Sequence, residues 1–404
     1  MHTEPPKEAV FFCFKNKRPS PFVSFKKHPH TNHIMGKIIM ILLTILIALA
    51  VLVVLIVRLN PSFGASPTGE RMQRIQQSPN FKDGKFQNPV ATAMQTEDMP
   101  FLRVMKEFLF TKGDRVPTTT IQTMPVDRAA FHQQTDGVKI CWLGHSTVLI
   151  EMDGQVILTD PVFSQRVSPF SFVGTKAFPY SENYHWENLP KIDLVLLSHD
   201  HYDHLDYKTI RSLKDQDLPF VTALGVGAHL ERWGIAPERI TELDWWESFQ
   251  FTENIRLTAT PARHFSGRGL TNRFSTLWAS WVITGPENRV FFGADSGYYP
   301  GFKTIGEQYG PFDLVMLECG QYSQYWPYIH MLPEEVIRAA NDLGAQSLLP
   351  IHWGKYKLSI HPWTEPIERL LQAGNNRNLA IGTPQIGEVF DLDKSLPTPE
   401  WWKE

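Results

Sequence analysis

The chain has 404 residues, of which 42% are hydrophobic, so it is long enough to bury one large core or two smaller ones. Its formal net charge is −3 and only 20% of its residues are charged, which excludes a strongly basic nucleic-acid-binding domain. Its cysteines, Cys13, Cys141 and Cys319, are too few for a disulfide framework or a cysteine zinc cluster, so histidine is the residue type to follow.

The first distinct segment is the apolar run of residues 38–57, IIMILLTILIALAVLVVLIV, which contains no charge. About twenty apolar residues are enough to cross a bilayer core as a helix. A buried core helix would normally keep a polar face, and a cleaved signal peptide usually has an apolar region of only about 7–15 residues. The run therefore predicts a retained transmembrane signal anchor.

Flanking charge predicts the orientation of this anchor. Arg58 is the only nearby cation after it, whereas these cations precede it: Lys7, Lys15, Lys17, Arg18, Lys26, Lys27 and Lys37. Cytoplasmic flanks carry the excess of Lys and Arg. We therefore expect a single-pass protein with its N-terminus in the cytoplasm and everything after Val57 outside it, in the periplasm if the source is bacterial.

These features divide the chain into four expected parts. Residues 1–37 form a basic cytoplasmic tail, which would be shorter if Met35 were the start, and residues 38–57 form the anchor. Residues 58–95 are polar, without sustained periodicity, and are expected to be a linker or a wrapping arm. Residues 96–404 form the expected globular domain.

Short apolar runs separated by turn residues predict an α/β domain. Residues 139–161 contain three such runs, the last two joined by the hairpin sequence MDGQ. The run IDLVLLS (192–198) predicts a strand buried on both faces. Five more runs end in polar or charged residues, at 255–262, 277–284, 289–296, 312–318 and 346–352. The segment LPEEVIRAANDLG (332–344) has helix start and stop residues.

Potential metal ligands follow these predicted strands. His199, His201, Asp203 and His204 form H-x-H-x-D-H directly after the buried run, and three further candidates follow other runs: His264, Asp295 and His352. Functional groups gather where strands end, on loops held by a rigid sheet. Imidazole and carboxylate groups are ligands that zinc prefers in catalytic sites. The pattern predicts a metal centre at one edge of a sheet assembly.

This order of motifs, H-x-H-x-D-H and then a lone His, a lone Asp and a final His, resembles that of the metallo-β-lactamase superfamily. The resemblance implies a four-layer αββα sandwich with two Zn²⁺ ions per chain. It further implies that His199, His201 and His264 hold one zinc. Asp203, His204 and His352 would hold the other, and Asp295 would bridge the two.

A narrower resemblance covers residues from about 88 to about 388. WLGHSTVLIEMDG, LTDPVFSQRVSP, LSHDHYDHLDY, ELDWWE, GPENRVFFGADSGY, GPFDL, HMLPEEVIRAA and IHWGKYKL are similar to motifs of the N-acyl-phosphatidylethanolamine-hydrolysing phospholipase D branch. That branch cleaves a membrane phosphodiester. Two departures are evident: the chain carries its own N-terminal span, and PARHFSGRGLTNRFST around His264 differs, which bears on acyl-chain preference.

Three further residues are candidates for the reaction or for support of the metal ligands. His145 and Asp160 are expected beside the ligands, because a metal-bound imidazole usually donates its other N–H to a carboxylate or carbonyl; pure turn roles are the alternative. His330 matches a branch histidine near the substrate phosphate and is expected to protonate the leaving alkoxide, or else simply to begin a helix. Asp203 and His330 are thus the predicted catalytic residues.

The combined prediction is a membrane-anchored zinc phosphodiesterase that hydrolyses N-acyl-phosphatidylethanolamine-like lipids to N-acylethanolamine and phosphatidic acid. A hydroxide held between two metals would attack phosphorus, and the metals would offset the phosphate charge. The alternatives are a lactonase or β-lactamase-like hydrolase and a non-catalytic membrane scaffold. The expected partners are a phospholipid substrate and the bilayer, with a homodimer as a further possibility. The aromatic segments 168–186 and 321–329 are expected either to contact lipid or to pack on the sheets.

Overall fold

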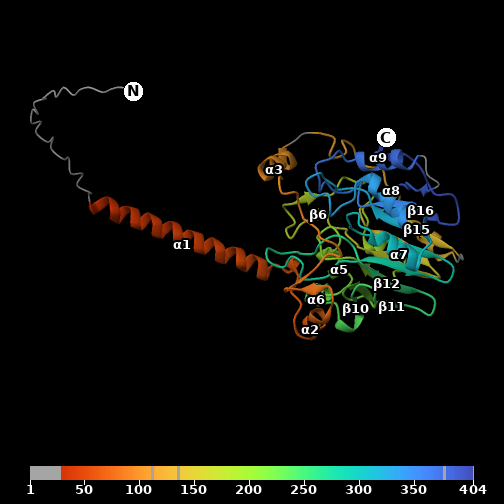
Figure 1. Ribbon diagram of the computed structural model, residues 1–404, viewed down its shortest axis with the longest axis horizontal. Helices are drawn as coiled ribbons and strands as arrows, with labels where there is room; N and C mark the ends of the chain where they lie inside the picture. Colours follow the sequence, from red (N-terminus) through yellow and green to blue (C-terminus); the bar gives the residue numbers. More distant parts are fainter. Residues whose placement is uncertain (1–28, 111–112, 134–136, 376–378, 404) are drawn as a thin grey trace, which may run out of the picture. The chain divides into compact units, whose positions relative to one another are not determined.

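The computed structural model describes residues 29–110, 113–133, 137–375 and 379–403 (Figure 1). The chain divides into two compact units, Met1–Ile56 and Val57–Glu404. The predicted tail falls largely outside the described residues, as does Cys13. The following paragraphs take each unit by itself.

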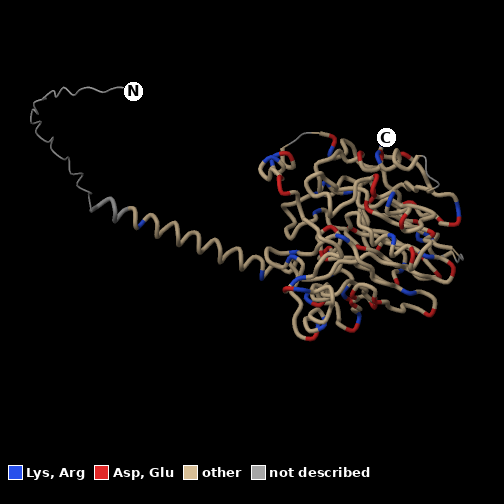
Figure 2. The backbone as a smooth tube through the Cα atoms, viewed as in Figure 1, with Lys and Arg blue, Asp and Glu red and all other residues tan. Residues whose placement is uncertain are grey.

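The first unit contains most of helix α1 (Pro29–Leu59), within which Met35–Leu59 is long and apolar enough to cross a membrane. The helix begins nine residues before the apolar run, because the polar residues ahead of Ile38 continue the same helical turns. Figure 2 shows no charged residue along α1 between Lys37 and Arg58. In a bilayer such a helix satisfies its own backbone hydrogen bonds.

The second unit is built on two seven-stranded mixed sheets. The first has the order β10-β9-β8-β5-β4-β3-β18, with these bounds: β3 (Val138–Trp142), β4 (Val148–Met152), β5 (Gln155–Thr159), β8 (Leu194–Leu197), β9 (Phe220–Ala223), β10 (Ile240–Leu243) and β18 (Val389–Asp391). The second has the order β11-β12-β13-β14-β15-β16-β17: β11 (Ser248–Gln250), β12 (Arg256–Thr260), β13 (Ser280–Thr284), β14 (Arg289–Phe292), β15 (Phe312–Glu318), β16 (Ala345–Ile351) and β17 (Ala380–Ile381). Two small ribbons pair β1 (Phe81–Lys82) with β2 (Lys85–Phe86) and β6 (Arg166–Val167) with β7 (Thr175–Lys176).

Helices cover the two sheets, which gives the expected α/β architecture (Figure 1). Helix α8 packs on β15 and β16 beside α7 and α9, and α6 packs on β10. The helices of this unit are α2 (Gly69–Gln77), α3 (Phe101–Phe110), α4 (Arg128–His132), α5 (Tyr207–Ser212), α6 (Gly227–Arg232), α7 (Gly301–Tyr309), α8 (Pro333–Asp342) and α9 (Glu365–Gly374). Short 3₁₀ turns occupy Pro61–Phe63, Trp186–Asn188, Pro237–Arg239 and Trp401–Lys403. The predicted helix at 332–344 is confirmed as α8, where the Glu335 side chain accepts a bond from the Leu332 N–H.

The strand predictions are confirmed, but several strands are shorter than their runs, and the run at 289–296 is a strand only as far as Phe292. The MDGQ turn joins β4 to β5, and Asp153 and Gly154 take the positive φ values that such tight turns need. The run at 277–284 becomes a strand only from Ser280. The N–H groups of Leu277 and Ala279 instead donate to Leu224 and Ser198 of loops that follow strands of the other sheet. These bonds tie the two sheets together at the edge where the ligands lie.

The core is continuous between the sheets, and its largest fully buried side chains include Trp142, Trp278, Trp281 and Trp353. Cys141 and Cys319 are free and buried in it, as expected for structural thiols. Burial raises the pKa of both thiols, which keeps them protonated and unreactive.

Residues 57–95 pack against the sheet body as part of the same unit. The Arg71 guanidinium on α2 bonds Glu242 and Glu231 at 2.5 and 2.6 Å. Asn80 donates to the Asp244 carboxylate at 2.9 Å. This segment therefore fixes the start of the body to the first sheet and to the loop that follows it.

Candidate metal centre

Loops at the ends of β5, β8, β12, β14 and β16 carry the predicted site residues. β5, β8 and β9 run parallel, as do β14, β15 and β16, so their carboxyl ends lie at common edges. Asp160 follows β5, the H-x-H-x-D-H segment follows β8, and His264 follows β12. Asp295 and His352 follow β14 and β16. The structure brings all seven predicted ligands together, in two overlapping groups.

The first group consists of His199, His201, His264 and Asp295, whose ligand atoms all lie within 4.8 Å of one another. His201 Nδ1 lies 2.9 Å from His199 Nε2 and 3.2 Å from His264 Nε2. Asp295 Oδ2 lies 3.6 Å from His264 Nε2. The other nitrogen of His264 faces the Ile329 carbonyl at 2.9 Å, which orients the ring.

The second group consists of His145, Asp203, His204 and His352. Asp295 also reaches this group, since its Oδ1 lies 3.1 Å from His204 Nε2 and 3.0 Å from His352 Nδ1. Asp203 Oδ2 lies 3.5 Å from His204 Nε2. Asp295 is thus placed between the groups, with one carboxylate oxygen toward each.

The donor set of both groups fits divalent metal ions. A neutral imidazole donates from only one nitrogen, so the three facing nitrogens of His199, His201 and His264 cannot all be satisfied by hydrogen bonds to one another. His204 Nε2 and Asp295 Oδ1 are buried without a hydrogen-bond partner among the described residues, although they lie 3.1 Å apart. Cations between these lone pairs would satisfy them all.

The pKa values of the histidines in these groups also fit bound divalent metal ions. Burial lowers the pKa of His199 and His264 well below the usual range, so both rings are neutral and have a lone pair to give. His204 differs: burial lowers its pKa, but Asp295 and Asp203 outweigh burial and raise the pKa well above the usual value. The carboxylates therefore attract positive charge at the place where a metal would lie.

Asp160 and His145 contact the predicted ligands, and His145 itself offers a ring nitrogen to the second group, so the supporting role of both stays a prediction. Asp160 Oδ2 is 2.7 Å from His204 Nδ1, and Asp160 also accepts from the Ser198 backbone N–H and hydroxyl. His145 Nε2 lies 2.9 Å from Asp203 Oδ2. The fully buried Asp160 carboxylate thereby orients the His204 ring so that Nε2 faces Asp295.

Backbone strain is concentrated around the site. His145, Asp160 and His352 have φ values of 55°, 33° and 66°, and Ala294, just before Asp295, has 47°. Non-glycine residues rarely adopt this left-handed region, and they persist there when the surrounding structure holds them. The sharp turns aim the side chains inward from the strand ends.

His330 lies at the rim of the site on the segment that leads into α8. Its Nδ1 is 2.6 Å from Oε2 of Glu318, a fully buried carboxylate at the end of β15. Because Nδ1 is engaged, Nε2 is the nitrogen left for a ligand. Glu318 was not among the predicted site residues. Its position, as a charged residue at the end of the apolar run 312–318, could have indicated a role in the site.

A cavity of about 470 Å³ opens directly over the two groups. His201, Asp203 and His330 lie on one side of it, and α3 forms much of the other. The α3 residues that line it recur at helical spacing: Phe101, Val104, Met105 and Phe108. Further apolar walls come from Met94, Met99, Phe265, Trp326, Ile329 and Leu358. The helix was not predicted from the sequence, although Asp98 and Pro100 precede it and are typical helix-start residues.

Comparison with known proteins agrees with this architecture. A family model described as a β-lactamase superfamily domain matches residues 155–353. An uncharacterised protein of Mycobacterium tuberculosis is 42% identical over 335 residues, covering 81% of this chain and 88% of that protein. The N-acyl-phosphatidylethanolamine-hydrolyzing phospholipase D 1 of Caenorhabditis elegans is 34% identical over 289 residues, covering 67% and 80%. A possible metal-dependent hydrolase from Veillonella parvula has a similar solved structure, with a TM-score of 0.51, 14% identity and coverage of 63% and 99%.

The fold and the two ligand groups define a metal-dependent hydrolase with the metallo-β-lactamase fold, and not the non-catalytic scaffold considered above. More particularly, the chain belongs to the metallo-β-lactamase superfamily, in the branch that contains the N-acyl-phosphatidylethanolamine-hydrolysing phospholipases D.

Proposed function

We propose that the protein hydrolyses N-acyl-phosphatidylethanolamine-like membrane phospholipids, releasing N-acylethanolamine and leaving phosphatidic acid. The observation that carries the proposal is the apolar cavity directly over the ligand groups. The apolar α3 side chains line the same cavity as the ligand groups. Acyl chains would contact α3 while the phosphate lies beside the ligand groups. Two branch relatives are named for hydrolysis of this lipid class, and one of them is the Caenorhabditis elegans protein. A small polar lactone or β-lactam would leave most of this apolar wall unused.

Two Zn²⁺ ions are the proposed cofactors, held by the seven residues described above. When bound, such a pair supplies Lewis acidity for the phosphate and an activated water at neutral pH. The chain's own contribution is orientation: Asp160 fixes His204, the Ile329 carbonyl fixes His264, and α3 lines the cavity in which the lipid would lie. Asp203 acts in the reaction as a ligand.

His330 is the proposed proton donor to the departing alkoxide. The Glu318 carboxylate lies 2.6 Å from Nδ1, which leaves Nε2 as the donor atom, and His330 donates as the imidazolium, a form that Glu318 stabilises although burial lowers the pKa of His330. A positioned acid of this kind contributes roughly 10²–10⁴-fold to a rate when the leaving group is a poor one. We therefore expect the leaving group of the substrate to lie on the side of the cavity that carries His330.

The test of the proposed function begins with a mixed lipid extract incubated with zinc-loaded full-length protein. We expect N-acyl-phosphatidylethanolamine to disappear and N-acylethanolamine and phosphatidic acid to form in equal amounts. In water labelled with heavy oxygen, the label should enter phosphatidic acid and not the ethanolamide, because attack is at phosphorus. Label in a phosphorylated ethanolamide would show cleavage on the other side of the phosphate. An unchanged extract, with turnover of a β-lactam or lactone panel, would overturn the proposal.

A further inference from the structure

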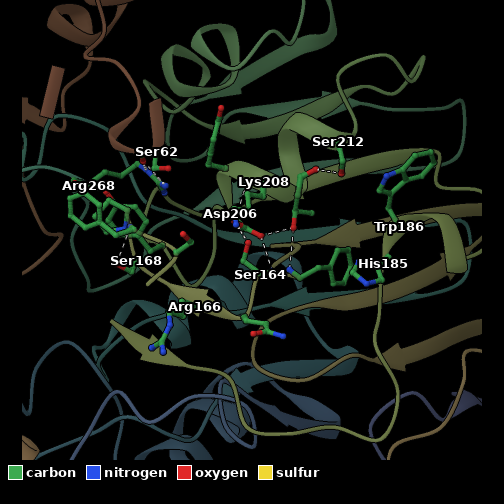
Figure 3. A pocket seen from close by; sticks show the side chains of 18 of the residues that line it. Ser62, Ser164, Arg166, Ser168, His185, Trp186, Asp206, Lys208, Ser212 and Arg268 are labelled. Carbon is green, nitrogen blue, oxygen red and sulfur yellow. Dashed lines mark hydrogen bonds between the residues drawn. The ribbon is translucent and has the colours of Figure 1, made fainter. Parts of the chain in front are cut away.

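A second cavity, of about 450 Å³, is lined in part by the metal-binding turn, residues 199–206 (Figure 3). Tyr202 and Asp206 of that turn line it, whereas His201 and Asp203 line the cavity over the metal centre. Its remaining walls come from the loop 163–171, the turn 185–187, helix α5, Ser62 and Arg268, whose guanidinium already donates to the Ser62, Asp200 and Leu205 carbonyls. Its volume falls within the roughly 300–1,000 Å³ typical of small-ligand sites. Nothing in the proposed reaction uses this space.

Ser62 places this cavity close to the end of the membrane helix along the chain. It follows Leu59, the last residue of α1, by three positions, and an extended chain spans at most about 3.6 Å per residue. The cavity wall therefore lies within roughly 11 Å of the helix end, a distance comparable to the headgroup layer of a bilayer. The closeness of this cavity to the bilayer depends on the membrane span and not on the reaction at the metal centre.

Residues 60–63 are held firmly on this cavity rather than tethered loosely. The Asn60 side chain donates to the Pro169 carbonyl at 2.9 Å, and the Trp233 indole donates to the Pro61 carbonyl at 2.7 Å. The rings of Phe63 and Phe170 meet edge to face, with centroids 6.0 Å apart. The cavity thus has a fixed position relative to the point where the chain leaves the helix.

The cavity carries unpaired positive charge. Arg166 and Lys208 line it, and neither forms an ion pair with a carboxylate in the described part of the chain. The carboxylate of Asp206 is already occupied, since it accepts from the Ser164 N–H and hydroxyl and from the Thr209 hydroxyl (Figure 3). Glu187, the other lining acid, is exposed.

One donor in the cavity wall has no acceptor. The Trp186 indole nitrogen is buried without a hydrogen-bond partner, and an indole N–H can only donate. That nitrogen is buried within the wall, so the indole ring and not its N–H lines the cavity. Arg166 and Lys208 are the lining cations that suit a phosphate oxygen.

The rim of the cavity is apolar and exposed. Phe172 is 80% exposed and Val173 is 51% exposed, both on the loop that contributes Phe170 to the wall. Large exposed apolar side chains in a soluble surface are unusual, but aromatic side chains favour the membrane interface. An apolar rim next to a cationic cavity is complementary to a phospholipid, whose acyl chains adjoin its phosphate.

We propose that this cavity binds the phosphodiester headgroup of an anionic membrane phospholipid and holds the catalytic unit on the bilayer that the anchor spans. The headgroup phosphate contacts Arg166 and Lys208 beside the Trp186 ring, and Phe172 and Val173 enter the acyl region. The bound lipid is not the substrate, since it lies across the turn from the metal centre.

The test uses the detergent-solubilised full-length protein titrated with dihexanoyl-phosphatidylglycerol or dihexanoyl-phosphatidylcholine. Binding is measured by calorimetry and by the Trp186 fluorescence, taken as the difference between wild type and Trp186→Phe. We expect the anionic lipid to bind roughly tenfold more tightly than the zwitterionic lipid, because the two lining cations repel the choline cation that balances the phosphate of phosphatidylcholine. The double variant Arg166→Gln/Lys208→Gln should lose this preference.

The matched control removes two exposed cations elsewhere, Lys85→Gln/Arg128→Gln, and should retain the tenfold preference. Equal binding of both lipids, or a preference that the cavity variant keeps, would overturn the proposal. Inorganic phosphate provides the third arm. If it binds the wild type as tightly as the anionic lipid, with the same Trp186 response, the site takes a soluble phosphate and the lipid assignment is wrong. Failure of phospholipid hydrolysis would leave all of these outcomes unaffected.

Discussion

Asp295 has an oxygen directed toward each ligand group, so a single substitution at this residue tests both metals at once. Asp295→Asn keeps the size of the side chain but removes the charge that two divalent ions would share. We expect weaker binding of both metals and a loss of turnover greater than roughly a hundredfold, which exceeds the usual effect of removing a supporting contact. Metal content by mass spectrometry and lipid turnover measure the two effects.

Two controls make this result specific. His264→Ala should chiefly empty one position, because His264 contacts only the first group. Asp153→Asn removes a carboxylate from an exposed turn at φ 50°, where asparagine is well tolerated, and should leave metal content unchanged. Two metals retained per chain in Asp295→Asn would show that this carboxylate is not the bridge.

Lys355 gives a prediction about pH. Its ammonium is buried and donates to the Val162 carbonyl at 2.9 Å, and burial lowers the pKa of Lys355 to about 7, against 10.5 for an ordinary lysine. The folded state therefore loses this proton at lower pH than the unfolded state does. The resulting destabilisation, roughly 5 kcal/mol at most, is fully present below pH 7 and declines as the pH rises from 7 to about 10.5.

We accordingly expect the free energy of unfolding of Lys355→Met, relative to wild type, to be most favourable near pH 7 and to fall steadily toward pH 10. The lost hydrogen bonds add a constant cost, so the slope of the difference is informative and not its absolute value. Lys303→Met, at an exposed lysine, serves as the control and should show a much smaller slope. A difference that does not change with pH would mean that Lys355 remains charged in the folded protein.

At the residue level, the ligands were predictable and their supporting partners largely were not. H-x-H-x-D-H is contiguous, and His264, Asp295 and His352 each follow an apolar run. Because residues that follow the strands of a sheet gather at its edge, these side chains were expected to meet. Glu318 and Ser198 also end strands, but their roles depend on contacts with His330 and Asp160 that only the folded chain defines. Asp200 is a clearer case, because its partners His229 and Thr276 are far away in the sequence.

At the level of elements, the strands followed from periodicity, whereas the segment between the anchor and the body did not. Its polar residues make specific contacts that no local pattern records. Ala65 donates its N–H to His229 Nδ1 at 3.0 Å, and His229 Nε2 lies 3.1 Å from Asp200 Oδ2. Asp200 sits between His199 and His201, so this segment is linked to the metal-binding turn through two side chains.

Gly64 allows that link to be tested. A Cβ added at Gly64 would lie 1.9 Å from His229 Nδ1, and its φ of 71° disfavours other residues. Gly64→Ala should therefore displace Ala65 or His229, lower stability and reduce turnover through Asp200. Gly84→Ala is the matched control, since Gly84 has φ 76° but nothing within 4 Å of an added Cβ. It should lose only the conformational term of about 1–2 kcal/mol.

Thermal unfolding, metal content and turnover of both glycine variants provide the measurement. A larger loss of stability in Gly64→Ala, accompanied by slower turnover, is the expected result. If the two variants are equally stable and both keep full turnover, the contact between the segment and His229 does not support the metal-binding turn.

At the level of the whole molecule, the prediction concerns topology. Helix α1 presents apolar side chains over Met35–Leu59, none of them buried within the protein, and in water this exposure would be strongly unfavourable. Its cationic N-terminal flank and single following Arg58 favour a cytoplasmic N-terminus. We therefore expect an integral protein with the catalytic unit on the far side of the membrane.

The protein should remain in the membrane fraction after an alkaline carbonate wash, which removes proteins held only by surface contacts. A reporter fused after Glu404 that is active only outside the cytoplasm should be active, and one that is active only inside should be silent. As a control, inserting two lysines into the middle of the apolar run should release the protein from the membrane, because each charge costs roughly 2.5–3.5 kcal/mol at the centre of a span. Activity of the cytoplasmic reporter alone would show that the predicted orientation is wrong. Release of the wild type by carbonate would show that the predicted membrane span is wrong.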